Sequence, residues 1–251
     1  VCSSDLDVDN GSSDICGAVT LAISKDTFTC ANVGANVITL TVTDKNGNIN
    51  TAFATVTVED KVKPVVNTKN ITVQLDNEGK VSIVAADVNN VSTDACGIST
   101  MTVSKTSFTC ANVGPNTVTL TVTDVNGNSN TNTATVTVED KVKPIAIGKP
   151  ITISLNGTSG LVSIIAADVD NGSSDSCGVK SLSVSPNSFN CSNVGVNMVT
   201  LTVTDNNDNV STTLVPVTVL DTTAPVLVTK AFTATLSSTG KSVRYFVGSE
   251  E

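Results

Sequence analysis

The chain has 251 residues, of which 39% are hydrophobic, 15% are charged and 3% are aromatic, and its net charge is -9. It can bury a core, which valine, threonine and alanine must fill. Histidine and tryptophan are absent and tyrosine occurs once, so the commonest general base and the usual aromatic binding platforms are missing. This composition argues against an enzyme, and the negative charge argues against binding to nucleic acid. No apolar run approaches the roughly 20 residues that span a bilayer, so we expect no membrane insertion.

The two ends of the chain differ from the rest. Residues 1–6, VCSSDL, match the translation of a sequencing adapter, GTG-TGC-TCT-TCC-GAT-CTN, and the closing GSEE is similar to RSEE, which the opposite strand encodes. The repeat pattern described below is lost outside residues 7–241, and the only arginine, Arg244, falls in the departing tail. We therefore predict that residues 1–6 and 242–251 are non-native and that the chain is a fragment, and we leave Cys2 out of the cysteine pattern. A divergent terminal repeat is the alternative.

An internal repeat organises the chain. Three segments that begin at Asp7, Ala86 and Ala167 align almost without gaps, and equivalent positions step by 80 and then 81 residues. The units end at VEDKVKP, VEDKVKP and VLDTTAP, where a proline stops the strand ladder. The predicted units are a truncated repeat 1 (residues 1–64), repeat 2 (65–144), repeat 3 (145–225) and the start of a further repeat (226–251).

Within a repeat the hydrophobic period is 2. In repeat 2, strands are predicted for ITVQLD (71–76), VSIVAAD (81–87), residues 98–103, TVTLTVTD (117–124) and ATVTVED (134–140). Asn-Gly and Gly-Asn turns separate them, and helix signals are nearly absent. The predicted fold class is all-β, with tandem immunoglobulin-like antiparallel β-sandwich domains in an elongated array.

Six cysteines remain, in pairs 14 residues apart within each repeat. Even, periodic pairs predict disulfides and an exported protein, with buried free thiols as the alternative. A zinc site is disfavoured because two thiolates without histidine cannot complete a tetrahedral site. A phenylalanine two residues before the second cysteine of each pair is predicted to lie in the core beside the bridge. The predicted bridges are Cys16–Cys30, Cys96–Cys110 and Cys177–Cys191, and the phenylalanines are Phe28, Phe108 and Phe189.

Acidic loops are candidate calcium sites. DVDNGSSD occurs twice and DVNNVSTD once, each with oxygen ligands at positions 1, 3 and 8, and Ca²⁺ prefers such hard oxygen ligands. The loop candidates are Asp7, Asp9 and Asp14, then Asp87, Asn89 and Asp94, then Asp168, Asp170 and Asp175. A second cluster is predicted at the repeat junctions, where Asp60, Asp140 and Asp221 follow the last strands and approach loop carboxylates of a neighbour. The alternative is that all of these are ordinary turn residues, which is the role predicted for Asp44, Asp124 and Asp205.

The repeat pattern resembles the HYR (hyalin) repeat and its immunoglobulin-like relatives in large bacterial surface proteins and adhesins. The matching motifs are D-x-C-G, S-F-x-C-x-N-V-G, V-T-L-T-V-T-D-x-N-G-N and V-T-V-x-D-x-x-x-P, and the resemblance covers residues 7–225. It implies extracellular modules that serve as spacers or adhesive units.

The leading functional hypothesis is a structural or adhesive stalk of a secreted, cell-surface protein without catalysis. Its partners would be neighbouring repeats of the same chain, and other proteins or surface glycans. A self-assembling extracellular filament subunit, which joins chains through edge strands, is an alternative. An accessory carbohydrate-binding module of a secreted enzyme is another, although the scarcity of aromatic residues counts against it.

Overall fold

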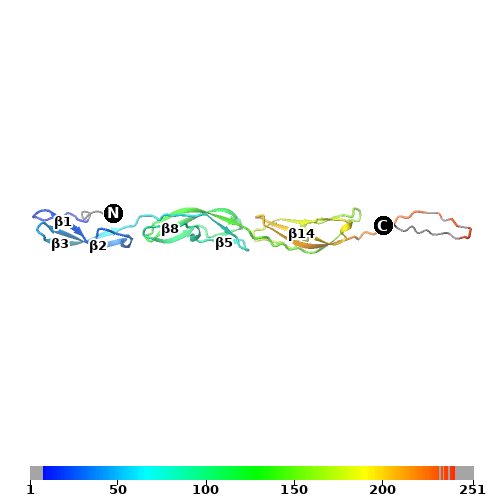
Figure 1. Ribbon diagram of the computed structural model, residues 1–251, viewed down its shortest axis with the longest axis horizontal. Coiled ribbons are helices and arrows are strands. Elements are labelled where there is room, and N and C mark those ends of the chain that lie inside the picture. The colour runs from blue at the N-terminus through cyan, green and yellow to red at the C-terminus, as the bar shows by residue number, and fades with distance from the viewer. Residues whose placement is uncertain (1–7, 232, 234, 237, 241–251) are drawn as a thin grey trace. The chain divides into compact units, whose positions relative to one another are not determined.

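The computed structural model describes residues 8–231, 233, 235–236 and 238–240 (Figure 1). The predicted non-native ends, Cys2 and the candidate ligand Asp7 therefore lie outside the described residues. The chain forms two compact units. One contains the described residues up to Ala146 together with Gly172–Leu182 and Thr202–Ser211, and the other contains Ile147–Asn171, Ser183–Leu201 and the described residues from Thr212 onward. No helix in the described part of the chain is long and apolar enough to cross a membrane.

Repeat 2 folds as an immunoglobulin-like β-sandwich. Its larger sheet has the strand order β4-β9-β8-β6 and its smaller sheet pairs β5 with β7. The connections contain one helical turn, α1, and a short 3-10 helix, η3. The bounds are β4 (Ile71–Gln74), β5 (Lys80–Ser82), α1 (Ala85–Val88), β6 (Ile98–Val103), β7 (Ser107–Thr109), η3 (Cys110–Asn112), β8 (Gly114–Asp124) and β9 (Ser129–Glu139).

The same elements recur in repeat 3, where β14 is the equivalent of β8 (Figure 1), and part of the set recurs in repeat 1. Repeat 3 has the sheets β10-β15-β14-β12 and β11-β13, and repeat 1 has the sheet β1-β2-β3. In repeat 1 the bounds are β1 (Val19–Ile23), η2 (Cys30–Asn32), β2 (Gly34–Asp44) and β3 (Ile49–Val58). In repeat 3 they are β10 (Ile151–Ser154), β11 (Val162–Ser163), α2 (Ala166–Val169), β12 (Val179–Ser185), β13 (Ser188–Phe189), η4 (Cys191–Asn193), β14 (Gly195–Asp205) and β15 (Val210–Leu220).

The all-β class is confirmed, but the larger sheets of repeats 2 and 3 each contain one parallel pair and are not purely antiparallel. The first strand of repeat 2, β4, runs parallel to the last, β9, with Ile71 opposite Val136. Parallel neighbours need a long crossover connection, and here the intervening strands of both sheets provide it. All other pairs in repeat 2 are antiparallel, and β8 and β9 are in register from Gly114↔Val138 to Thr123↔Ser129.

The core follows the predicted period of 2. Val118, Leu120 and Val122 of β8 are buried, while the alternating threonines on the other face are exposed or half-buried. Phe108 and Phe189 are also buried, as predicted, and Phe108 belongs to the same cluster as the β8 side chains. Phe28, for which the same was predicted, is only half-buried. Successive side chains of a strand point to opposite faces, so this sequence can bury only one face of each sheet.

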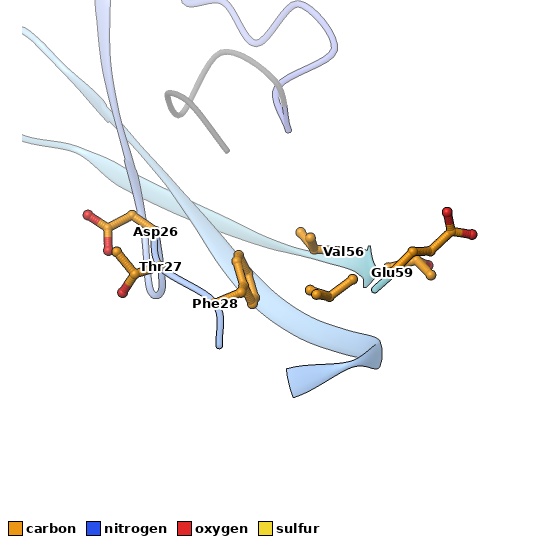
Figure 2. Close-up of a pocket in the computed structure, with 7 residues that line it drawn as sticks. Asp26, Thr27, Phe28, Val56 and Glu59 are labelled. Atoms are coloured by element: carbon orange, nitrogen blue, oxygen red, sulfur yellow. The ribbon is translucent and has the colours of Figure 1, made fainter. Parts of the chain in front are cut away.

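One edge of repeat 1 is open. The strand β3 corresponds to β9, but no strand in the described part of the chain pairs with its outer edge. A groove of about 430 Å³ runs there instead, and Figure 2 shows Phe28 and Val56 among the side chains that line it. The equivalent edges of β9 and β15 are covered by β4 and β10.

We predict that Leu120→Ala lowers the free energy of unfolding of repeat 2 by about 2–5 kcal/mol, because it leaves a cavity in a fully buried site. The matched control Thr117→Ala, on the exposed face of the same strand, should change it by no more than about 0.5 kcal/mol. Calorimetric unfolding of the two variants measures the difference. Equal effects would contradict the assignment of the buried face.

Candidate functional site at the repeat junctions

Two disulfides join consecutive repeats. Cys30 of repeat 1 is bonded to Cys96 of repeat 2, and Cys110 of repeat 2 is bonded to Cys177 of repeat 3. The bonded residues are 66 and 67 positions apart in the sequence, so the predicted pairing within each repeat, Cys16–Cys30, Cys96–Cys110 and Cys177–Cys191, is wrong. The prediction that these cysteines form disulfides holds for four of the six.

The length of β8 explains why the two cysteines of one repeat do not bond to each other. Cys96 lies just before β6, whose first residue Ile98 pairs with Asp124 at the end of β8, whereas Cys110 lies just before Gly114 at its start. An 11-residue strand is about 33 Å long. Disulfides need Cα atoms about 4.4–6.8 Å apart, so the two cysteines of one repeat cannot reach each other. Each instead meets a cysteine of the adjoining repeat, with Cα–Cα distances of 5.1 and 5.2 Å.

Cys16 and Cys191 are exposed free thiols. Cys16 is equivalent to Cys96 and Cys177, and Cys191 is equivalent to Cys30 and Cys110. Each free thiol thus belongs to a sequence position that forms a bridge elsewhere in the chain.

A polar socket lies beside each disulfide. We use "junction socket" for Asp94, Asp124 and Asn128 in repeat 2 and for Asp175, Asp205 and Asn209 in repeat 3. The first socket receives Asp60, whose carbonyl oxygen accepts a hydrogen bond of 3.0 Å from the Asn128 amide. The second receives Asp140 in the same way, with a hydrogen bond of 3.2 Å from Asn209.

The equivalent place in repeat 1 is an open pocket of about 220 Å³, lined in part by Asp14, Asp44 and Asn48. Asp14, Asp44 and Asn48 are the counterparts of the junction-socket residues in repeat 1. Among the described residues, no aspartate from a preceding strand occupies this pocket. The socket is therefore a regular feature of the repeat that accepts the end of the repeat before it.

The turn aspartates of the sockets behave as predicted for Asp44, Asp124 and Asp205. One oxygen of Asp124 accepts the backbone N–H groups of Asn126 and Asn128, and the other accepts the Asn128 amide, each at 2.8 Å. Burial acts to raise the pKa of Asp124, but these hydrogen bonds outweigh it and lower the pKa below its usual value. Asp44 and Asp205 make the same set of bonds.

The pKa of Asp140 is shifted in the opposite direction to that of Asp124. Its burial raises the pKa of its carboxyl above the usual value, and the negative charges of Asp175 and Asp205 raise it further, against a hydrogen bond from the Val142 N–H. Asp140 is 7% exposed, so this is a buried carboxylate among like charges.

The candidate calcium ligands divide between turns and junctions. Asp87 and Asp168 accept backbone N–H groups at the start of α1 and α2, Asp9 accepts those of Gly11 and Ser12, and Asn89 bonds Ser92. Among the described residues, Asp168, Asp170 and Asp175 of the third loop do not form a group of neighbouring ligand atoms. Two other groups do: Asp60, Asp94 and Cys96, and Asp140, Asp175 and Cys177, whose ligand atoms lie within 4.8 Å of one another.

The remaining candidates lie apart from these groups. Asp14 accepts the Cys16 N–H, and Asp221 accepts the Thr223 N–H in the same local turn that Asp60 and Asp140 form. Neither joins a metal-ligand group within the described residues. The structural pattern predicts that each would need a neighbouring repeat to complete such a group.

Further junction contacts were not predicted from the sequence. The Ser176 hydroxyl donates to the carbonyl of Asn77, and Gly79 lies so close to the Cys110 Sγ that a Cβ atom there would come within 2.6 Å. The role of Asn128 and Asn209 at the junctions was also not predicted. The sequence does contain a pattern that could have indicated it, because each asparagine lies four residues after the turn aspartate, Asp124 or Asp205.

Comparisons with known proteins name no family. No protein-family model matches the chain, including the hyalin repeat, and no curated protein sequence is similar to it. Similar solved structures include protocadherin gamma B7 extracellular cadherin domains 1-4, with a TM-score of 0.35, 11% identity, and coverage of 81% of this chain and 66% of that chain. The extracellular domain of protocadherin gammaB4 has a TM-score of 0.35 and 12% identity, and the match covers 80% of this chain and 43% of that chain. Immunoglobulin domains 1-4 of sidekick-1 have a TM-score of 0.33 and 10% identity, and the match covers 77% of this chain and 60% of that chain.

The chain thus spans about two thirds or less of the length of these structures. The strand order, register and buried faces of the chain itself define it as an immunoglobulin-like tandem-repeat protein with disulfides between repeats.

We predict that a digest of the unreduced protein yields peptides that link Cys30 to Cys96 and Cys110 to Cys177, because these pairs meet the distance that a disulfide requires. Cys16 and Cys191 should react with iodoacetamide in the folded protein, since both are exposed. Mass spectrometry reads out both results. A Cys96–Cys110 peptide would contradict the junction described here.

Proposed function

We propose that the chain is part of a structural or adhesive stalk of a secreted bacterial cell-surface protein and has no catalytic role. The observation that carries this proposal is the covalent bond between consecutive repeats, which recurs at the same position in two junctions. Disulfides form and persist in oxidising extracellular compartments, which supports an extracellular location. The resemblance to hyalin repeats of bacterial surface proteins supports the same reading, with neighbouring repeats as the first partners and other proteins or glycans as distal ones.

The disulfides define the path that a pulling force takes through the chain. A force applied to the two ends passes from Cys30 through the bond to Cys96, along the 14 residues to Cys110, and through the second bond to Cys177. The residues between the bonded cysteines, including both VEDKVKP linkers, lie outside this path. A stalk under tension would therefore resist extension even where a repeat unfolds.

We predict that reduction lengthens the fully stretched chain by about 460 Å. The two bonds bypass 66 and 67 residue steps, and an extended residue spans about 3.5 Å. Single-molecule force spectroscopy of the chain held by its ends, with and without reductant, measures this difference. A Cys16→Ser/Cys191→Ser variant is the matched control and should show the same lengthening. An identical contour length in both conditions would refute the proposed force path.

A self-assembling extracellular filament subunit, which would join chains through edge strands, is the second candidate.

This alternative predicts that the chain associates as its concentration rises, which light scattering during size-exclusion chromatography measures. A monomer at all concentrations would remove the filament candidate and leave the stalk proposal intact.

A further inference from the structure

Each junction contains two carboxylate oxygens that have no hydrogen-bond partner. They are the Oδ2 atoms of Asp60 and Asp94 at the first junction and of Asp140 and Asp175 at the second, and all four are buried. The Oδ1 atom of each residue accepts a backbone N–H two residues further on, at 2.7–3.0 Å. One oxygen of each carboxylate is thus held by its own turn, and the other faces the junction.

Among the described residues, no lysine forms an ion pair with these oxygens. In the described part of the chain, the linker lysines Lys61 and Lys141 pair with Glu59 and Glu139, and no ion pair involves an aspartate of the junctions. A buried carboxylate oxygen without a partner is costly, and two carboxylates close together repel each other. The arrangement is unfavourable unless something else occupies the space between the two side chains.

The chemistry of the donors selects the occupant. Two hard anionic oxygens suit Ca²⁺, which completes its shell with waters and carbonyl groups. Zinc is disfavoured because the nearby sulfur atoms of Cys96 and Cys177 are disulfide-bonded and cannot act as thiolates. The two carboxylates come from consecutive repeats, Asp140 from the end of repeat 2 and Asp175 from the D-x-C-G loop of repeat 3.

We propose that each junction binds one Ca²⁺ ion between the aspartate that ends one repeat and the aspartate that precedes the bridging cysteine of the next. The sites are Asp60 with Asp94 and Asp140 with Asp175. Calcium is therefore held between repeats and not within a single DVDNGSSD loop. This site depends on the junction geometry alone and is independent of the proposed stalk function.

The ion and the disulfide would hold the same loop. The Oδ1 atom of Asp175 accepts the N–H of Cys177 at 2.7 Å, and Asp94 does the same for Cys96 at 2.8 Å. A cation on the Oδ2 atom of the same side chain fixes the carboxylate that orients the cysteine backbone. Calcium should therefore stiffen the segment that carries the bridge.

The test is calorimetric titration of the oxidised full chain with CaCl₂ after removal of metal by chelator. We expect about two ions per chain, with dissociation constants of about 10⁻⁴–10⁻³ M, as for extracellular calcium modules. Asp175→Asn and Asp94→Asn should each lose one ion, and the double variant should lose both. Asp168→Asn, in the same loop as Asp175, is the matched control and should keep both, because Asp168 caps α2.

Variants of the aspartates at the end of the preceding repeat distinguish loss of the calcium site from misfolding of the loop that carries the cysteine. Asp140→Asn and Asp60→Asn should reproduce the losses of Asp175→Asn and Asp94→Asn, with all disulfides intact by mass spectrometry. Absence of calcium binding by the unmodified chain would overturn the proposal and would indicate a shared proton or a water between the carboxylates. Loss of binding in Asp168→Asn but not in Asp175→Asn would overturn it in favour of a site within the loop.

Discussion

The length of one strand determines how the repeats are joined. The central strand of each sandwich, β8 or its equivalent, runs for 11 residues from the glycine after the second cysteine to the turn aspartate. It holds the two cysteines of a repeat at opposite ends, too far apart to bond. Each repeat therefore presents one sulfur atom at each end, and a disulfide between repeats is the arrangement that satisfies the distance requirement.

The junction compensates for a modest core. The buried side chains of repeat 2 are mostly valine, with Phe108 as the only aromatic residue in its described cluster. A disulfide that closes a loop of this size stabilises the folded state by about 4 kcal/mol, because it lowers the conformational entropy of the unfolded chain. The same bond ties two sandwiches together, so its contribution is shared between folding and assembly. The socket hydrogen bonds from Asn128 and Asn209 add a polar contact at the same place.

The sequence predicts local features well and long-range pairing poorly. The alternation in TVTLTVTD, the burial of Phe108 and the turn role of Asp124 all depend on neighbouring residues, and the structure agrees with each. The cysteine pairing depends on how far apart two ends of a strand lie in space, which spacing along the chain does not reveal. The calcium candidates are a mixed case, since the predicted approach of Asp60 and Asp140 to loop carboxylates of the neighbouring repeat is present, whereas Asp168, Asp170 and Asp175 do not form a ligand group within their own loop.

The position of the linkers inside the disulfide-closed loops has a consequence for survival in a protease-rich environment. Both VEDKVKP linkers lie between bonded cysteines, within residues 30–96 and 110–177. A single backbone cut anywhere in either loop leaves the two pieces covalently attached through the bridge. Between Cys30 and Cys177, only residues 97–109 would sever the chain when cut, and these include β6 and β7, whose backbones are held in sheets. Linkers are ordinarily the weakest points of a multidomain protein, but a single cut in either VEDKVKP linker separates nothing.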